Sequence, residues 1–515
     1  MTTTLESPAP AATEAAYEGR RRPAVVALAR FEARELLLKV PVFAVLVLYL
    51  AETGWAMFSG HEGMDDFPAL QDVDRATQSG SLLVGVALFA CANRAVLRSR
   101  RRGTDRHFDV LVMEPWRRTL GHALSVVPFA LLVALVVAFR FGRAAVEPGA
   151  VGHGSVAELA VGPLTVLLGG VAGVLLGRLI PSSFAAPLFA VALYVAVTYV
   201  GVFADNALWS RWLAPVVEDR GADPFPSDLV GRPAAWHALY LTGLVATLLG
   251  AALLRSGGRT VRVKAVTALA LAATAAGIAG QAQGPSAALE AARAKVSVSP
   301  EQAESCTVRG TTTYCALPEW TGRTAEWAKT VTRVQSLAGG SAAGQRLTVR
   351  QRVDARDGLQ NDPYYEPLTR RGETTVLTRW GGNRIPEFSV GLASVLVAGD
   401  EKAGAAVCDG RVVTVMWLAL GNDPAPMTAL RNVRLDDSVK GSAYVLTPTN
   451  GLKMSAEQTR IVRELLHRPR PQVTAAVKAH WAELTAPGVP TVRVGRLLGV
   501  PSAAPGTESE DACGE

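Results

Sequence analysis

The sequence predicts an α-helical membrane domain of six to seven transmembrane helices, followed by an α+β extracytoplasmic domain. Charged residues make up only 19% of the 515 residues, against about 25% in soluble proteins. Long stretches between residues 41 and 284 are almost free of charge, whereas the composition after residue 285 is that of a soluble protein. This asymmetry predicts three parts: an N-terminal cytoplasmic segment (1–39), a transmembrane domain (40–284) and an extracytoplasmic domain (285–515).

Apolar runs of membrane-spanning length divide the first half of the chain. A bilayer core of about 30 Å requires roughly 20 apolar residues, and these must be helical because unpaired backbone groups are costly in lipid. Seven runs meet this requirement: Val40–Phe58, Gly80–Leu97, Leu120–Phe141, Leu159–Ile180, Phe184–Ala204, Trp236–Leu254 and Ala265–Ala282. The last is rich in Ala and Gly rather than Leu and Phe, so the prediction is six to seven spans.

Charged residues are few within the predicted spans, and Glu52 in the first and Arg94 in the second are the notable ones. Charges in a membrane are costly and therefore indicate function by default, so Glu52 and Arg94 are candidates for a substrate path. Both stand near span ends, and the alternative is that they reach the membrane interface.

Basic residues alternate between the loops in a way that predicts orientation. Arginines and lysines gather in 20–39, 98–118 and 255–264, whereas acidic residues gather in 62–74 and 218–228. Because cytoplasmic loops are enriched in Lys and Arg, we expect a multi-pass plasma-membrane protein with a cytoplasmic N-terminus and residues after about 285 outside. The net charge is +7, and the arginines lie next to apolar runs. This placement favours membrane lipids over nucleic acid as the partner.

Four of the five cysteines lie in the predicted outer domain, where disulfides form. We expect Cys306 to pair with Cys315 and Cys408 with Cys513, although four cysteines allow three connectivities. A zinc site is the rival interpretation. The spacing lacks C-x2-C and no histidine stands nearby, so no metal site is predicted.

Motifs for catalysis are missing from the sequence. It contains no G-x-x-x-x-G-K-[ST] phosphate loop, no H-E-x-x-H and no G-x-S-x-G, and its seven histidines are scattered. We therefore predict no catalytic residues and no cofactor held by this chain.

The predicted cytoplasmic loop from Arg98 to Thr119 combines many arginines with an apolar patch. Phe108, Leu111 and Val112 have i, i+3, i+4 spacing, which predicts a short interfacial helix that presents an apolar face to a partner. Pro115 ends the patch, and Arg117 and Arg118 lead into the next span. The alternative is a basic loop that only fixes topology.

This arrangement resembles permease subunits of the ABC-2 type, the exporter class of ABC transporters. The segment ALARFEARELLLKVPVF (27–43) is similar to the amphipathic entry helix of that family, and the 98–119 loop is similar to its coupling segment. The matching residues of the loop are Gly103, Thr104, Leu111, Pro115, Arg117 and Arg118. The resemblance covers roughly residues 20 to 255.

The resemblance implies an exporter permease that performs no chemistry itself. A separate ATPase subunit would hold ATP and Mg and grip the 98–119 loop, and a second permease copy, identical or related, would complete the machine. Arg101 and Arg102 replace the acidic residues that the family often shows before its G-T pair. A seventh span with an outer domain resembles some actinobacterial permeases. The alternative function is a non-transporting membrane protein whose outer domain binds a ligand or assembles with partner proteins.

Alternating and helical patterns predict the elements of the outer domain. Arg346–Val353 and Thr374–Arg379 alternate as strands do, and Ser455 precedes a helix that Glu457 helps to cap. Gln472–Leu484 is predicted to form a second helix beside it. Tyr314, Trp320 and Trp327 form an aromatic cluster, either as a small core or as a ligand platform.

Overall fold

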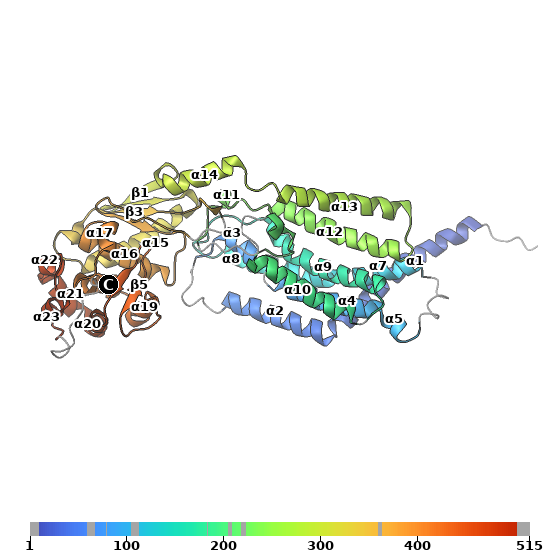
Figure 1. Cartoon of the computed structure of the whole chain (residues 1–515), viewed down its shortest axis with the longest axis horizontal. Coiled ribbons are helices and arrows are strands. Elements are labelled where there is room, and N and C mark those ends of the chain that lie inside the picture. The colour runs from blue at the N-terminus through green and yellow to red at the C-terminus, as the bar shows by residue number, and fades with distance from the viewer. Residues whose placement is uncertain are drawn as a thin grey trace, which may run out of the picture.

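The computed structural model describes residues 10–58, 67–78, 80–104, 113–182, 184–203, 209–217, 223–358 and 363–501. A helical bundle forms one half of an elongated molecule, and a domain of helices and short strands forms the other (Figure 1). The predicted division into a helical first half and a mixed second half is confirmed.

Six helical stretches in the described residues are long and apolar enough to cross a membrane, as expected for a membrane-embedded protein. They are α2 (Val40–Phe58), Leu70–Val96 with α3 (Leu70–Ala76) and α4 (Ser81–Val96), Pro115–Ala145 with α7 (Pro115–Leu124) and α8 (Val127–Ala145), α9 (Val156–Leu179), α12 (Ala234–Arg255) and α13 (Val261–Gln281). The fifth predicted span is also helical, as α10 (Ala185–Phe203), which packs on α4; its described apolar stretch, Ala185–Ala196, is shorter than the other six.

The third span begins earlier than the sequence pattern predicts. We expected it to begin at Leu120, but α7 begins at Pro115, so Arg117 and Arg118 lie on the helix. Proline suits the first helical position because its fixed φ matches the helix and its missing N–H has no partner there in any case.

Helices α4 and α9 approach each other at glycines. A Cβ at Gly169 would overlap the Gly85 carbonyl, and one at Gly173 would overlap the Phe89 carbonyl. Small residues at a four-residue spacing let helix backbones pack closely in a membrane. Glycine at positions 169 and 173 therefore lets the backbones of α4 and α9 approach closely.

Basic and acidic segments lie at opposite ends of the bundle. α1 (Pro10–Leu37) and α5 (Arg98–Arg101) lie at the end away from the C-terminal domain (Figure 1). The link between α12 and α13 lies at the same end, because Gly258 lies against Trp116 of α7. We call this the basic end. The segment around α3 lies at the other end, against the C-terminal domain.

The C-terminal domain contains a four-stranded sheet in the order β1-β2-β3-β4. Strands β1 (Ser305–Arg309) and β2 (Thr312–Ala316) form an antiparallel hairpin, and β3 (Thr348–Gln351) and β4 (Glu373–Val376) continue in parallel. Both predicted strands are confirmed: β3 lies within Arg346–Val353, whereas β4 begins one residue before Thr374 and ends before Arg379. A second sheet pairs β5 (Ala443–Val445) with β6 (Leu452–Met454).

Helices surround these two sheets, and apolar side chains from both helices and strands form a buried core. They are α14 (Ala287–Val298), α15 (Thr324–Leu337), α16 (Arg384–Ala398), α17 (Glu401–Ala405), α18 (Arg411–Leu420), α19 (Pro426–Asn432), α20 (Ala456–His467), α21 (Arg470–Ala479), α22 (Trp481–Leu484) and α23 (Thr491–Leu497). Trp320 and Trp327 are fully buried, and Tyr314 is 2% exposed in the same core. The aromatic cluster is therefore core rather than an open platform.

Two predictions about the last helices need correction. Ser455 does cap α20, but its reciprocal partner is Gln458, whereas Glu457 pairs with Arg460. Gln458 stands at the third helical position, from which a side chain reaches back to the cap. The second predicted helix is interrupted at His480 into α21 and α22, and α21 packs against α15.

The C-terminal domain docks on the bundle through partly buried polar contacts. Arg323 donates to the carbonyls of Phe67 (3.0 Å) and Gly149 (3.3 Å), both in segments that connect the bundle helices. Glu319 accepts from the backbone N–H of Ser227, at the start of α11 (Ser227–Val230). These contacts join residues distant in sequence and fix the domain to one end of the bundle.

Candidate functional site

Helix α1 lies along the basic end and packs on α7. Its buried face carries Val25, Ala29, Glu32 and Leu36, spaced three and four residues apart. Leu28 covers Gly121 of α7, where a larger side chain would overlap it. An amphipathic entry helix, implied by the family resemblance, is thus consistent with the packing of residues 25–36.

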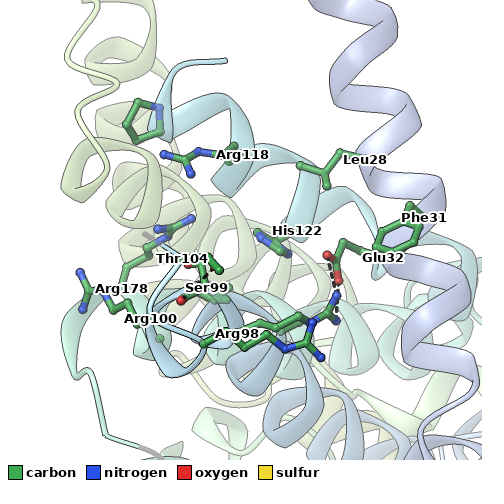
Figure 2. Close-up of a pocket in the computed structure, with 15 residues that line it drawn as sticks. Leu28, Phe31, Glu32, Arg98, Ser99, Arg100, Thr104, Arg118, His122 and Arg178 are labelled. Atoms are coloured by element: carbon green, nitrogen blue, oxygen red, sulfur yellow. Dashed lines mark hydrogen bonds and ion pairs between the residues drawn. The ribbon is translucent and has the colours of Figure 1, made fainter. Parts of the chain in front are cut away.

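A bidentate ion pair connects α1 to α5. Arg98 donates to both carboxylate oxygens of Glu32, at 3.3 and 3.1 Å (Figure 2). Burial raises the pKa of the Glu32 carboxyl, and the neighbouring Arg98 opposes that rise. The pair fixes the start of the 98–119 loop against the entry helix.

The structure describes the predicted coupling residues only in part. Gly103 has φ +65°, the left-handed conformation that glycine adopts readily, and Thr104 Oγ1 donates back to the Ser99 carbonyl (3.3 Å). Phe108, Leu111 and Val112 lie outside the described residues.

The loop resumes at Met113 and enters α7. Arg117 pairs with Glu114 (2.8 Å), and its guanidinium lies 4.9 Å from the centre of the Trp116 ring. Thr119 Oγ1 lies 2.8 Å from Ser256 Oγ at the end of α12. The start of α7 is therefore in contact with both α1 and α12, so a force on the loop would reach several helices.

A cavity of about 840 Å³ opens between these elements, and we call it the arginine cavity. Its described lining includes Pro115 and the side chains of Arg98, Arg100, Arg102, Arg118 and Arg178. Figure 2 shows arginines from α5, α7 and α9 around one hollow, with Leu28, Phe31 and Glu32 of α1 on one side. The structure thus brings together Thr104, Pro115 and Arg118 from the predicted set and adds Arg178, which the sequence analysis did not select.

A second cavity of about 420 Å³ adjoins the first and shares Arg98 and Arg102 with it. Arg94 lines this second cavity together with Lys39 and Arg101. Glu52 lies elsewhere, exposed on α2 with its carboxylate near Gly80, at the opposite end of α4 from Arg94. The structure does not bring the two predicted substrate-path residues together, since about 14 helical residues correspond to roughly 20 Å.

A buried polar network at the other end of the bundle was missed by the sequence analysis. Arg75 pairs with Glu158 at 3.1 Å, and both side chains are less than a tenth exposed. Asp74 accepts from the Ser155 N–H (2.8 Å) and pairs with Arg232. These contacts tie α3 to the start of α9 and to the segment before α12. Arg75 and Glu158 stand as isolated charges beside apolar runs, and this pattern could have indicated a buried ion pair.

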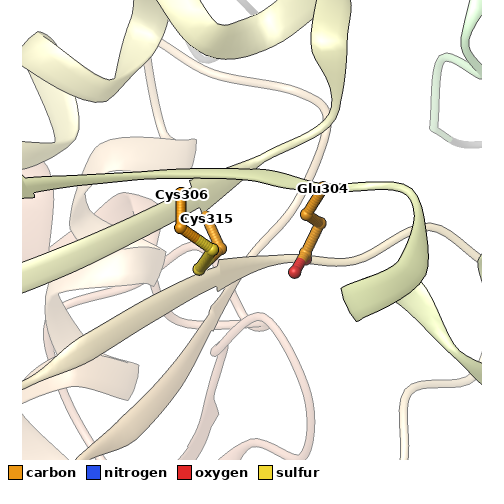
Figure 3. Close-up of side chains that lie close together, drawn as sticks. All are labelled: Glu304, Cys306 and Cys315. Carbon is orange, nitrogen blue, oxygen red and sulfur yellow. A yellow bond between two sulfur atoms is a disulfide. The ribbon is translucent and has the colours of Figure 1, made fainter.

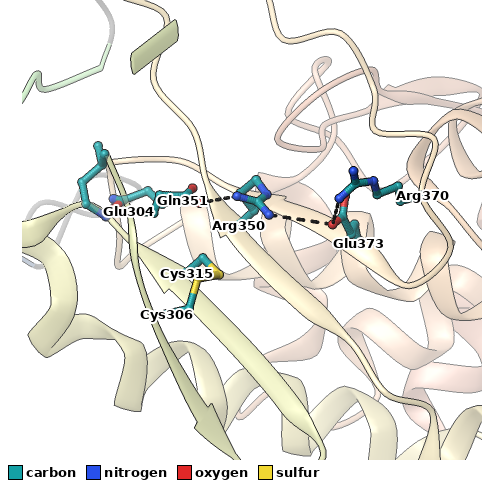
Figure 4. Close-up of a disulfide and its surroundings, with 8 residues drawn as sticks. Glu304, Cys306, Cys315, Arg350, Gln351, Arg370 and Glu373 are labelled. Carbon is teal, nitrogen blue, oxygen red and sulfur yellow. Dashed lines mark hydrogen bonds and ion pairs between the residues drawn. A yellow bond between two sulfur atoms is a disulfide. The ribbon is translucent and has the colours of Figure 1, made fainter. Parts of the chain in front are cut away.

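The cysteines of the C-terminal domain agree with the disulfide prediction where they are described. Cys306 and Cys315 are bonded and stand opposite each other in the β1–β2 hairpin (Figures 3 and 4). Cys408 is also disulfide-bonded, and Cys513 lies outside the described residues. Glu304 lies near the first disulfide, but the S–S bond uses the two sulfur atoms that a metal ion would require. Cys91 is free and buried in α4.

Comparison with known proteins does not identify a family: the chain matches no protein-family model, no curated protein and no solved structure.

Proposed function

We propose that the chain is the membrane-spanning permease subunit of an ABC exporter, which moves a substrate across the plasma membrane with ATP hydrolysed by a separate subunit. The observation that carries the proposal is the construction of the basic end. There the 98–119 loop connects α4 to α7, and α7 contacts α1, α9 and α12. Movement of a partner bound to this loop would therefore be transmitted to several helices of the bundle at once.

The sidedness of the bundle supports the same proposal. Basic segments lie at one end, and the disulfide-bonded domain docks at the other. Because basic loops face the cytoplasm and disulfides persist outside it, the ATPase would meet the basic end. The chain carries no phosphate-loop motif, so ATP and Mg would belong to that partner.

The outward faces of the bundle support lipid and permease partners. Large apolar side chains are exposed on α2, α10 and α13, including Phe43 (58%), Leu188 (70%) and Leu269 (71%). In a membrane these faces would contact lipid or a second permease subunit, identical or related. A dimer would supply the two membrane subunits that an exporter of this class uses.

Co-purification of an ATPase tests the proposal. A tagged chain is purified from its native membranes, and bound proteins are assayed for ATP hydrolysis. The double variant Phe108→Ala/Leu111→Ala removes two apolar side chains predicted to face the ATPase, and Val261→Ala is the control because Val261 is 82% exposed beside the other basic link. We expect the recovered ATPase to fall about tenfold in the double variant, equivalent to ~1.4 kcal/mol, and to be unchanged in the control.

The opposite result favours a different kind of protein. If no ATPase accompanies the wild-type chain, the permease proposal fails. The chain would then be a non-transporting membrane protein that acts through its outer domain. Recovery that is equal in the double variant and the wild type would refute the role of the 98–119 loop.

A further inference from the structure

A buried carboxyl lies beside the Cys306–Cys315 disulfide at the start of the β1–β2 hairpin. A carboxylate oxygen of Glu304 and the two sulfur atoms all lie within 4.8 Å of one another (Figure 3). Glu304 Oε2 accepts from Arg350, whereas Oε1 is buried and meets no hydrogen-bond partner among the described residues. A buried carboxylate oxygen without a partner is costly, so its position beside a disulfide indicates a chemical role.

The two cysteines of this disulfide differ in their exposure to solvent. Cys306 is exposed on the edge strand β1, whereas Cys315 is only 2% exposed on β2. Thiol–disulfide exchange begins when a thiolate attacks one sulfur and displaces the other, and exposed disulfides are the ones that exchange. Cys306 is therefore the sulfur that a thiolate in solution reaches, and Cys315 is the one that leaves with the electron pair of the S–S bond.

Charged groups stand close to the leaving sulfur. Arg350 lies opposite Cys315 in the register of β2 and β3, so the two side chains are on the same face of the sheet. Figure 4 shows Arg350 between Glu304 and Glu373. Burial raises the pKa of Glu304 to about 7, although Arg350 opposes the rise. The charges of Glu301 and Glu373 add to this rise in pKa. Near neutral pH the carboxyl can give a proton to a thiolate, directly or through one water.

We propose that Cys306 and Cys315 form a thiol–disulfide exchange site that takes two electrons from a dithiol, with Glu304 as the proton donor. One thiolate of the dithiol attacks Cys306 Sγ. A mixed disulfide forms, the Cys306–Cys315 bond breaks, and Cys315 Sγ takes the proton of Glu304.

The second thiolate of the dithiol completes the exchange. It attacks the mixed disulfide and releases Cys306, so the dithiol is oxidised to a disulfide and the cysteine pair is reduced to two thiols. The two protons that the dithiol loses to solvent balance those gained by Cys306 and, through Glu304, by Cys315. This inference does not depend on the permease proposal, because it concerns the purified chain without an ATPase.

The pH dependence of reduction tests the role of Glu304 in the purified full-length chain. Dithiothreitol is the reductant, and the freed Cys306 and Cys315 are alkylated and quantified by mass spectrometry. Attack needs a reductant thiolate and a protonated Glu304. The wild-type rate should therefore rise about tenfold per pH unit below pH 7 and level off between about pH 7 and pH 8.5. In Glu304→Gln the rate should be about tenfold lower at pH 6 and should rise over the whole range.

The control is Glu301→Gln, which removes an exposed carboxylate three residues away and should keep the wild-type profile. A carboxyl that only stabilised the hairpin would give the opposite curvature, because reduction would become steeper above pH 7, where that stabilisation is lost. Such a profile, or identical profiles for the wild type and Glu304→Gln, would overturn the role of Glu304.

Two single-cysteine variants test which sulfur is attacked. Cys315→Ser and Cys306→Ser both lack the disulfide, so their loss of stability is matched. We expect Cys306 in the first variant to form a mixed disulfide with oxidised glutathione at least about tenfold faster than Cys315 in the second. Equal rates, or faster reaction of Cys315, would contradict the assignment of Cys306 as the attacked sulfur.

A second reductant distinguishes the sources of the dithiol. An unstructured peptide with two cysteines replaces dithiothreitol, and each rate is divided by that of the same probe with oxidised glutathione. A higher ratio for the peptide supports a protein dithiol as the substrate, and a higher ratio for dithiothreitol supports a small dithiol. Resistance of the Cys306–Cys315 bond to both probes in the folded chain would overturn the exchange site.

Discussion

Glu304, just before β1, makes the stability of the C-terminal domain depend on pH. Its side chain is fully buried and pairs with Arg350 (Figure 4). Burial raises the pKa of Glu304 from 4.5 to about 7, although Arg350 opposes the rise. The folded state therefore binds the Glu304 proton more tightly than the unfolded state does. The protonated carboxyl stabilises the fold fully below about pH 4.5, and this stabilisation is lost as the pH rises through 7.

We therefore predict that the Tm of the C-terminal domain falls between pH 5 and pH 8, with Glu304 contributing on the order of 3 kcal/mol. Fluorescence of the buried tryptophans follows the transition in the full chain. Glu304→Gln should flatten this pH dependence, and Glu326→Gln, which removes an exposed carboxylate paired with Lys329, should leave it intact. An equally steep pH dependence in Glu304→Gln would contradict the assignment.

Polar partners at the residue scale were the least predictable from sequence. The acidic residues of 62–74 served only to predict orientation, and no partner was predicted for them, yet Asp74 is 2% exposed and pairs with Arg232, 158 residues later. Apolar periodicity reports which face of an element is buried, but not which distant charge a polar residue meets. Cysteines are the exception, because the Cys306–Cys315 pair is close in sequence and has few alternatives.

At the scale of elements, the β1–β2 hairpin depends on its disulfide. All five residues of β1 are exposed, so this edge strand buries little apolar surface to hold it in place. Cys306→Ser/Cys315→Ser should lower the free energy of unfolding of the C-terminal domain by about 2–3 kcal/mol, the loop-closure value for this short separation. Urea unfolding followed by tryptophan fluorescence measures it.

The matched control for the hairpin is Cys91→Ser. This thiol is free in α4, so its replacement should leave unfolding of the C-terminal domain unchanged. Unfolding that is identical with and without the Cys306–Cys315 bond would show that the sheet holds β1 unaided.

Element types were more predictable than their boundaries. Long apolar runs predicted the bundle helices because a membrane span needs a minimum length, and alternation predicted β3 and β4. The start of α7 was missed because arginines were interpreted as loop residues, whereas Pro115 begins the helix. Three of the coupling residues lie outside the described residues, so that part of the site stays a prediction.

For the whole molecule, Arg323 is the contact that most directly joins the two halves. It is 2% exposed and donates to Phe67 and Gly149 on the bundle side and to Thr378 in its own domain. Arg323→Met should leave buried carbonyls without donors, at about 2–4 kcal/mol. We expect faster hydrogen exchange in segments 67–76 and 146–155. Arg333→Met is the control, because the Arg333 guanidinium donates to Thr330 of the same helix, α15. Unchanged exchange in Arg323→Met would show that other contacts dominate the docking.

The opposite placement of the basic end and the disulfide-bonded domain is the central claim, and cysteine labelling tests it most directly. Leu435→Cys adds a thiol where the native side chain is 69% exposed on the C-terminal domain, and Arg102→Cys adds one at the basic end. A membrane-impermeant maleimide on intact cells should label Leu435→Cys at once, and Arg102→Cys only after permeabilisation. Labelling of both variants in intact cells, or of Arg102→Cys alone, would contradict the account.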